Sequence, residues 1–297
     1  MRGGWHQVAF ERDVRDDLTP IGRAGPPAML VKRGAHIEAF ADRCPHRGAR
    51  LTRGGRLEGA CVRCPFHGFR IGLGQRGEHP FALQALPTLV VSGLVFVRDP
   101  DDADRGFEAH MRELDMTHYI VPGFELAMGV AAPLVIENAF DAQHFVPVHD
   151  MPREPSFTCE ETPEGALHAQ GEFLLPPTGW RPNATGNARA PFDAFAFSPF
   201  FVSSRTGGDR PYITLTSAVP IGPRSCVIRL SMALPNRGTP PTEEECRFLL
   251  RQSKEGLLKD QVIWDGLDLD APQNFTTNDQ AVIAFRRFCA HATEKAV

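Results

Sequence analysis

The sequence predicts an α+β protein, in which an all-β N-terminal domain precedes a larger domain of antiparallel sheet and helices. Three observations support this class. The chain has 297 residues, of which 42% are apolar, enough for roughly two domains with buried cores. Short apolar stretches separated by glycine-rich loops fill residues 1–100, a pattern typical of β-structure. Helical and strand-like patterns share the rest of the chain.

The N-terminal domain is expected to span residues 1–100 and the second domain residues 118–297. Pro100 and the acidic run Asp101–Asp104 end the first domain, and the polar residues 101–117 read as a linker with one short helix. Turn signals separate short β-prone runs in the first domain. The expected strands are Trp5–Phe10, Met29–Lys32, Ile37–Phe40, Leu89–Val91 and Leu94–Val97.

Two loops between these strands carry candidate metal ligands. Cys44-Pro45-His46 is followed, after 17 residues, by Cys64-Pro65-Phe66-His67. Two thiolates on one iron and two imidazoles on the other are the ligand set of a Rieske [2Fe–2S] centre. Replacing two thiolates by imidazoles raises the reduction potential of such a centre, which suits it to accept electrons. Cys44, His46, Cys64 and His67 are therefore the predicted cluster ligands.

Two other interpretations of this region remain open. Cys61 and Cys64 form a CxxC pair, so Cys44, His46, Cys61 and Cys64 also suit a zinc site, although this leaves His67 without a role. Gly72–Gly77 matches GxGxxG, but the following residues contain two prolines and no helical period. A dinucleotide site needs a strand before that motif and a helix after it. We therefore expect a turn there, and no direct binding of NADH.

Composition argues against several classes of partner. The net charge of −4 gives no reason to expect a nucleic acid or an anionic membrane as a partner. No stretch approaches the ~20 apolar residues of a spanning helix, and the first residues lack the apolar core of a signal peptide. Of the seven cysteines, the five outside the predicted cluster have no patterned spacing, which suits a reducing compartment better than a disulfide framework. We therefore expect a cytoplasmic protein.

A second candidate metal site lies in residues 134–150. Asn138, Asp141 and His144 are spaced three apart, so they should share one side of a helix. His149 follows, and Pro147 should disturb the helix and turn His149 towards His144. Two imidazoles and one carboxylate form the facial triad of non-haem Fe(II) oxygenases. Taken alone, two ordinary histidines at a helix end would explain the pattern equally well.

The third ligand is expected from a later helix. Thr242 and Glu245 are spaced as a capping box that opens it. Leu257, Asp260 and Trp264 then fall on one stripe, and a carboxylate among apolar groups needs a partner such as a metal. Asp260 is therefore the predicted ligand. The competing carboxylates are Asp265, Asp268, Asp270 and Asp279.

Between these segments the sequence predicts an antiparallel sheet and an aromatic-rich region. Tyr212–Val219 and the alternating residues from Cys226 to Leu234 read as neighbouring strands. The chain has 21 Phe but 2 Tyr, so its aromatic surfaces offer few hydroxyl groups. A pocket with an apolar lining of this kind favours a hydrophobic, ring-bearing substrate. For each phenylalanine taken singly, a place in the hydrophobic core is an equally good explanation. The aromatic residues concerned are Trp180, Phe192, Phe195, Phe197, Phe200 and Phe201.

Together these motifs resemble those of the Rieske non-haem iron oxygenases, in particular their terminal oxygenase component. The similarity rests on CPHRGA at 44–49, CPFHGF at 64–69, the Asn-Asp-His-His pattern of 138–149 and the segment 260–264. Phe69 departs from the family, which often has Trp there. The resemblance implies a catalytic domain of helix-grip type. It also implies mononuclear Fe(II) at the predicted triad.

The family resemblance assigns roles to two further residues and to partners. Asp141 would hydrogen-bond His144 and a cluster histidine of the neighbouring subunit, bridging the two metals, and Asn138 belongs to the same motif. The short chain is similar to the α-only branch of ketosteroid hydroxylases, aromatic-ether demethylases and tailoring enzymes of secondary metabolism. That branch implies a homotrimer. A separate reductase, with or without a ferredoxin, would supply electrons from NAD(P)H.

The activity implied is monooxygenation, by hydroxylation or oxidative demethylation, of a hydrophobic ring-bearing substrate with O2 as co-substrate. Two alternatives stay open at this point. The same iron chemistry can serve desaturation or cyclisation without oxygen insertion. A redox- or iron-sensing protein would keep the cluster without turnover, and two irons per chain instead of three would reveal it.

Overall fold

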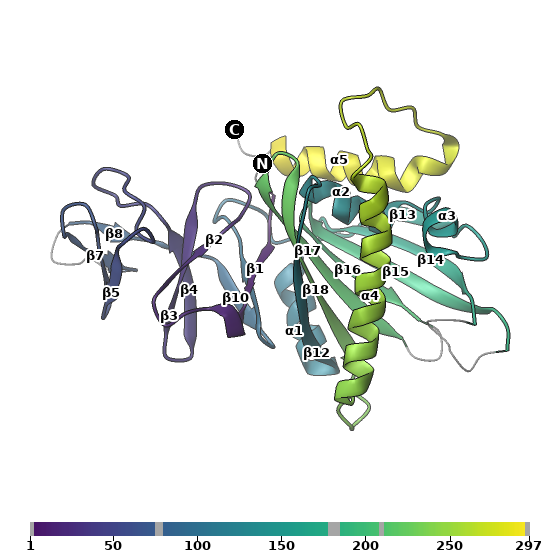
Figure 1. Ribbon diagram of the computed structural model, residues 1–297, viewed down its shortest axis with the longest axis horizontal. Coiled ribbons are helices and arrows are strands. Elements are labelled where there is room, and N and C mark those ends of the chain that lie inside the picture. Colours follow the sequence, from purple (N-terminus) through teal and green to yellow (C-terminus); the bar gives the residue numbers. More distant parts are fainter. Residues whose placement is uncertain (1–2, 75–79, 178–184, 208–210, 295–297) are drawn as a thin grey trace.

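The protein consists of two parts that lie side by side along its long axis (Figure 1). The computed structural model describes residues 3–74, 80–177, 185–207 and 211–294. The N-terminal part contains short strands, and the larger part is built on one long-stranded sheet with helices over it. The predicted α+β class, with an all-β N-terminal region, is thereby confirmed.

The N-terminal part forms three small sheets. Within the described residues its strands are β1 (His6–Phe10), β2 (Leu18–Ile21), β3 (Ala28–Arg33), β4 (His36–Ala41), β5 (Arg56–Glu58), β6 (Cys61–Arg63), β7 (Arg70–Leu73), β8 (Ala82–Leu83), β9 (Ala85–Leu86), β10 (Thr88–Val91) and β11 (Leu94–Val97). The sheet orders are β1-β11-β10, β2-β3-β4-β9 and β5-β6-β7-β8. The expected strands 29–32 and 37–40 pair as a hairpin, and so do 89–91 and 94–97. Ser92 and Gly93 have φ of 43° and 80°, the left-handed values that a tight two-residue turn requires.

Residues 101–117, expected to be a linker with one short helix, contain a helix that packs against both parts. Helix α1 (Phe107–Thr117) fills most of this segment, and its face of Phe107, Met111 and Leu114 is buried. Phe107 stacks on Trp5 of the N-terminal part at 5.2 Å and meets Phe201 of the larger part edge-on at 5.1 Å. The helix therefore ties the two parts together through one shared apolar cluster.

A seven-stranded antiparallel sheet organises the larger part. Its order is β12-β18-β17-β16-β15-β14-β13. The strands are β12 (His118–Met128), β13 (Phe157–Glu161), β14 (Leu167–Leu175), β15 (Ala188–Ser198), β16 (Phe201–Thr206), β17 (Tyr212–Gly222) and β18 (Ser225–Pro235). The helices are α2 (Ala132–Glu137), α3 (Phe145–His149), α4 (Glu243–Trp264) and α5 (Gln280–Glu294). Figure 1 shows α4 crossing in front of the sheet and α5 lying along its upper end.

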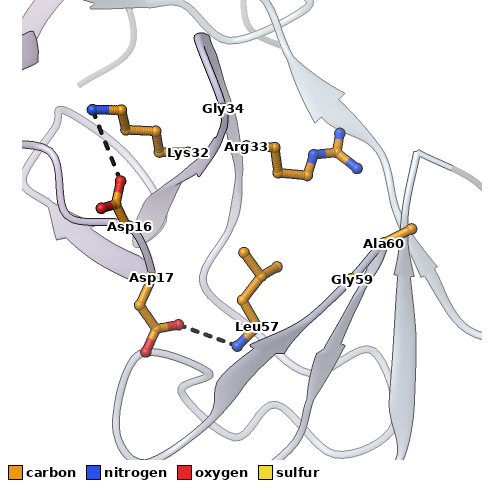
Figure 2. Close-up of a pocket in the computed structure, with 8 residues that line it drawn as sticks. All are labelled: Asp16, Asp17, Lys32, Arg33, Gly34, Leu57, Gly59 and Ala60. Carbon is orange, nitrogen blue, oxygen red and sulfur yellow. Dashed lines mark hydrogen bonds and ion pairs between the residues drawn. The ribbon is translucent and has the colours of Figure 1, made fainter.

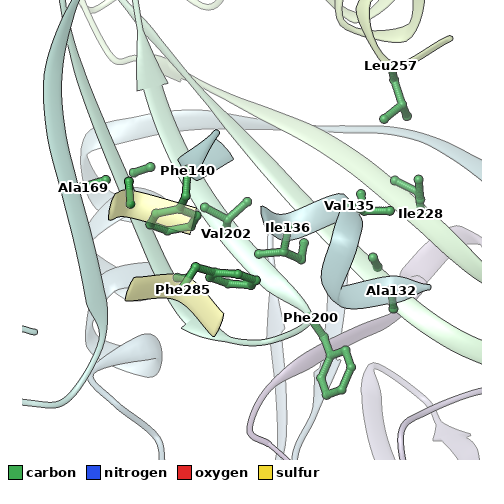
Figure 3. Close-up of a cluster of buried hydrophobic side chains, with 14 of the residues drawn as sticks. Ala132, Val135, Ile136, Phe140, Ala169, Phe200, Val202, Ile228, Leu257 and Phe285 are labelled. Carbon is green, nitrogen blue, oxygen red and sulfur yellow. The ribbon is translucent and has the colours of Figure 1, made fainter. Parts of the chain in front are cut away.

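The main core lies between this sheet and helices α2 and α5. Figure 3 shows Phe140 and Phe285 facing each other there, with ring centroids 5.0 Å apart and nearly parallel planes. Phe140 directly precedes Asp141, so this stack anchors the segment that carries Asn138 and Asp141. Burying two such rings removes a large apolar area from water and stabilises the fold accordingly.

Helix α4 follows the sequence prediction closely. The Thr242 hydroxyl accepts a hydrogen bond from the backbone N–H of Glu245 at 3.2 Å, so the helix begins at the predicted cap. Its buried residues are Leu257, Asp260 and Trp264, the predicted stripe. Among the described helices none is both long and apolar enough to cross a membrane. All seven cysteines lie within the described residues, and none of them forms a disulfide there.

Candidate metal centres

The two predicted cluster loops have the same backbone design. In each loop the cysteine N–H donates to the carbonyl five residues later: Cys44 to Ala49 at 2.8 Å and Cys64 to Phe69 at 2.9 Å. In each, the glycine four residues after the cysteine donates back to the cysteine carbonyl. These glycines have φ of 75° and 71°, a conformation that side chains resist. Glycine at the fourth position therefore shapes both loops.

The loops bring the four predicted ligands together at one end of the β5-β6-β7 sheet. Cys44 and Cys64 are buried and His46 and His67 exposed, with the two imidazole centroids 4.9 Å apart. Burial raises the pKa of the Cys44 thiol, while the backbone N–H of His46 stabilises its thiolate. Buried sulfurs with amide donors and outward imidazoles fit a Rieske cluster, whose potential depends on such hydrogen bonds.

The zinc alternative does not fit the geometry. A single ion needs at least three ligand atoms close together, and in the described residues one such group forms, away from these loops. No three of Cys44, His46, Cys61 and Cys64 meet that criterion. The unusual Phe69 lies 5.0 Å from the His46 ring and 5.8 Å from the His67 ring, so it packs against both imidazoles.

The segment 134–150 is not the single helix predicted from the sequence. Helix α2 ends at Glu137, a 3₁₀ turn covers Asn138–Phe140, and Asp141 is extended at φ −88° and ψ 100°. Helix α3 then begins after His144. Pro147 stands in its first turn, where its missing N–H has no helical partner to lose. The helix is therefore broken before His144, and Pro147 does not break it.

The three predicted iron ligands nevertheless form one group. His144, His149 and Asp260 each offer an atom within 4.8 Å of the others. Asp260 Oδ1 lies 3.0 Å from His149 Nε2 and 3.8 Å from His144 Nε2. The two imidazole planes are nearly perpendicular, with centroids 5.0 Å apart. All three side chains are largely buried, so a cation there would be shielded from bulk water.

Local hydrogen bonds set the state of His144. Its Nδ1 donates to the backbone carbonyl of Asp141 at 2.6 Å, which leaves Nε2 as the lone-pair nitrogen facing Asp260. Burial also lowers the pKa of His144, which favours the neutral imidazole that binds metals. Asn138 Nδ2 lies 3.2 Å from the same Nε2. The Nδ1 donation and the neutral ring fit a divalent metal bound at Nε2, where the metal would take the place of the Asn138 amide contact.

The Asp141 carboxylate does not occupy the expected position. Its Oδ2 is 3.9 Å from His144 Nδ1, beyond hydrogen-bond distance, because the Asp141 carbonyl already accepts that proton. Its Oδ1 accepts the backbone N–H of Gln143 at 3.0 Å. The side chain is about one-third exposed. This carboxylate is therefore partly exposed and keeps hydrogen-bond acceptor capacity beyond the contact with Gln143.

The competing carboxylates lie elsewhere. Asp270 pairs with Arg224, and Asp279 accepts from Gln143 and caps its own turn. Asp265 and Asp268 are exposed after the end of α4. Asp260 is thus the carboxylate that the fold brings to the two histidines. Sequence periodicity could find it because α4 is regular over its whole length.

Aromatic side chains adjoin the histidines, but mostly not those predicted. The ring centroid of Phe145 lies 4.1 Å from that of His144 and 4.7 Å from that of Phe173. The centroids of Phe173 and Phe192 are 4.9 Å apart, so the three phenylalanines form one cluster. Phe192 is thus the predicted aromatic residue that belongs to this cluster. Phe195, Phe197 and Phe201 pack towards α1, and Phe200 stacks on His6. Trp180 and Gly77 lie outside the described residues.

Phe145 is a residue that the sequence analysis missed, and adjacency to His144 was its sole signal. A cavity of about 430 Å³ lies on another side of the group. It is lined by Asn138, Asp141, His144, Asp260, Trp264, residues 267–269 and 271–274, and Arg286, among others. The Arg286 guanidinium in its wall is paired with Glu137. The metal group is therefore reachable from outside on the Asp141 side.

The two candidate centres are far apart within one chain. Strands β5 and β7, which flank the cluster loops, lie at one end of the long axis in Figure 1, and α3 lies towards the other. Because Figure 1 is a projection, the true separation is at least the separation seen. Electron transfer between these two centres of the same chain would have to span most of the molecule.

Comparison with known proteins agrees with both the motifs and the fold. Residues 4–88 match the Rieske [2Fe-2S] domain family. Dicamba monooxygenase bound to 3,6-dichlorosalicylic acid is 16% identical with a TM-score of 0.78, covering 100% of this chain and 99% of its own. NdmA of Pseudomonas putida CBB5, with caffeine, is 16% identical with a TM-score of 0.72, covering 96% and 89%.

NdmB of the same organism is 18% identical with a TM-score of 0.68, covering 95% of this chain and 88% of its own. No curated protein sequence matched the chain. At these identities the similarity to solved structures concerns the fold, and the family match concerns the N-terminal part. The chain therefore carries a Rieske [2Fe–2S] domain, and as a whole it has the fold of the Rieske non-haem iron oxygenases.

Proposed function

We propose that this protein is the terminal oxygenase of a multi-component system and monooxygenates a hydrophobic, ring-bearing substrate. One observation carries the proposal: a Rieske [2Fe–2S] domain and a group of two histidines and one aspartate occur in the same chain. Such a group with open positions is typical of non-haem Fe(II) oxygenases. The structures of similar fold include a monooxygenase bound to a chlorinated aromatic acid and a protein bound to caffeine.

The residues of each site fit the metals that the proposal needs. Cys44, His46, Cys64 and His67 would hold the cluster, and His144, His149 and Asp260 would hold Fe(II). The two centres together would supply electron transfer and activation of O2. The Asp141 carbonyl keeps the proton of His144 on Nδ1, so that Nε2 can bind metal. Phe145 packs against the His144 ring, and the buried Trp264 lines the cavity beside the group.

Assembly into a homotrimer is part of the proposal. The centres of one chain lie towards opposite ends of it, whereas a head-to-tail neighbour would place a cluster next to a foreign His144 group. The partly exposed Asp141 carboxylate would then accept a hydrogen bond from His46 or His67 of that neighbour. A separate reductase would supply the electrons, because the GxGxxG match begins inside β7 and the next described element is strand β8 and not a helix.

Metal analysis tests the proposal most directly. Purified protein should be brown and contain about three irons and two acid-labile sulfides per chain. With a reductase, NADH and labelled O2, the product of an accepted substrate should carry one labelled oxygen atom. A coloured protein with about two irons per chain would instead be a redox protein without an oxygenase site. Product without label would indicate desaturation or cyclisation.

A further inference from the structure

A row of three arginines crosses the sheet beside the cluster loops. Arg56 of β5 lies opposite Arg63 of β6, and Arg63 lies opposite Arg70 of β7. Directly opposed residues share one face of a sheet, and like charges in that position are destabilising. The face opposite the row is buried through Val62 and Ile71, so the arginine row faces outwards. Stability of the fold therefore does not explain the row, and a function in binding would.

Little negative charge offsets the row. Residues 43–70 contain seven arginines and one acidic residue, Glu58, in a chain whose net charge is −4. Glu58 is shared between Arg63, at 3.5 Å, and Arg70, at 3.4 Å. Arg56 has no carboxylate within ion-pair distance among the described residues. The surface around the arginine row is thus positively charged, although the chain as a whole is negatively charged.

The arginine row reaches the cluster loops. Arg63 directly precedes the ligand Cys64, and its guanidinium nitrogen lies 3.7 Å from where a side chain at Gly68 would begin. The exposed turn that carries Arg53 packs against the second loop through Gly54, whose added Cβ would lie 3.6 Å from Pro65. The positive surface is therefore continuous with the loop that carries His67.

The neighbouring hollow does not explain these charges. Figure 2 shows it beyond the β5–β6 turn, where Asp17 accepts the backbone N–H of Leu57 at 3.1 Å. Its cations have acids close by: Lys32 lies 3.9 Å from Asp16, and Arg33 pairs with Glu38. Its lining therefore has mixed charge. The arginine row is a flat strand surface, which suits a protein partner better than a small anion.

We propose that the arginine row is the docking surface for a small one-electron carrier protein with an acidic surface around its redox centre. The inference rests on the proposed function, for which such a carrier would be the immediate electron donor. An acidic partner is repelled by the rest of this negative chain and attracted at the row, so the charge distribution guides it to the cluster. In each encounter the carrier loses one electron and the oxidised cluster gains it.

Binding to an acidic plant-type [2Fe–2S] ferredoxin tests the proposal without turnover. Calorimetry with both proteins oxidised should show affinity that falls about tenfold between 20 and 200 mM salt. The double variant Arg56→Glu, Arg63→Glu should bind at least about tenfold more weakly at low salt. Arg237→Glu, which changes an exposed arginine in the loop after β18, should bind like the wild type.

Reduction kinetics provide the second measurement. Under anaerobic conditions and without substrate, reduced ferredoxin should bleach the cluster about tenfold more slowly in the double variant. Reduced lumiflavin, a small reductant, should reduce both proteins at equal rates, which shows that the variant cluster is intact. Neither experiment requires the His144 group. The docking proposal can therefore be tested even if the protein does not oxygenate any substrate.

Several outcomes would overturn the proposal. One is salt-independent ferredoxin binding that the double variant leaves unchanged. Another is a wild-type protein that does not bind the ferredoxin and is reduced by it no faster than by lumiflavin. A third is a double variant with unaltered ferredoxin affinity but a smaller mass by light scattering. The arginine row would then be an interface between copies of this chain.

Discussion

The cluster loops and the His144 group are built in opposite ways. Each cluster loop is closed by hydrogen bonds between residues four or five apart, and all four ligands lie within residues 44–67. The His144 group instead joins α3 to Asp260, 111 residues after His149 in sequence. One site is therefore a property of local sequence, and the other depends on how α4 packs.

Two contacts hold α4 in the position that the second site needs. Lys259 donates to Asp150 at 2.7 Å, directly after α3. Gly256 lies beside His149, whose Cε1 would be in ordinary van der Waals contact with an added Cβ, at 3.8 Å. From this difference we expect that substitutions in α4 abolish the iron site and leave the cluster intact. Changes in the cluster loops should act locally and nearly equally in both loops.

The largest expected effect is that of Asp260→Ala. It removes the carboxylate at 3.0 Å from His149, so iron should fall from about three to about two per chain and turnover should disappear. The visible spectrum of the cluster should remain, because the cluster loops share no residue with α4. Metal analysis and the spectrum are the measurements. Asp265→Ala, at the exposed end of the same helix, is the matched control. Unchanged iron content in Asp260→Ala would move the ligand to another acid.

A smaller effect is expected for Asp141→Asn, which tests the proposed link between the two sites. The change keeps the shape of the side chain and the backbone carbonyl that orients His144, but it makes the side chain a weaker hydrogen-bond acceptor. Both metals should stay bound, while cluster reoxidation in a single turnover with substrate and O2 slows roughly 10- to 100-fold. Stopped-flow absorbance measures this rate. A wild-type rate would mean that Asp141 has only a structural role.

The junction between the two regions should respond to pH through His6. Burial, together with nearby Arg23, lowers the pKa of His6 from 6.5 to about 4. Between these pKa values the unfolded chain binds the proton more readily, so stability falls as pH decreases and is fully present above pH 6.5. From pH 7 to pH 5 the loss should be about 2 kcal/mol.

His6→Gln supplies the control for this pH effect. It removes the titrating ring that stacks on Phe200 at 4.6 Å, so the variant should be less stable at pH 7 but should lose about 2 kcal/mol less than the wild type on acidification. Urea unfolding at both pH values measures the difference. Parallel losses in the two proteins would show that His6 is not the group responsible.

The smallest effects concern the symmetry of the cluster loops. Gly48→Ala and Gly68→Ala each place a side chain at a positive φ without a steric clash, so each should destabilise the protein by about 1–2 kcal/mol. The two losses should agree within experimental error by thermal unfolding. Gly129→Ala, at a glycine with open space and an ordinary φ, should be neutral. Clearly unequal losses would show that the loops differ in rigidity despite their shared hydrogen bonds.

Regular and local features were predictable from the sequence. The cluster ligands follow from the spacing of Cys and His, and Asp260 follows from the stripe of Leu257 and Trp264 on one long helix. Irregular backbone was not predictable. The expected helix through Asn138 and His144 is broken next to Phe140, which stacks on Phe285 of α5, more than a hundred residues later.

The sequence by itself thus determined which residues can bind metal and that an all-β domain precedes an antiparallel sheet with helices, because side-chain chemistry and local periodicity are written in neighbouring residues. Only the tertiary structure decided that the backbone carbonyl of Asp141, and not its carboxylate, orients His144. It also decided that Arg56, Arg63 and Arg70 form one row, which the net charge of −4 does not reveal. Strand register and helix packing set both, and these depend on contacts between distant residues.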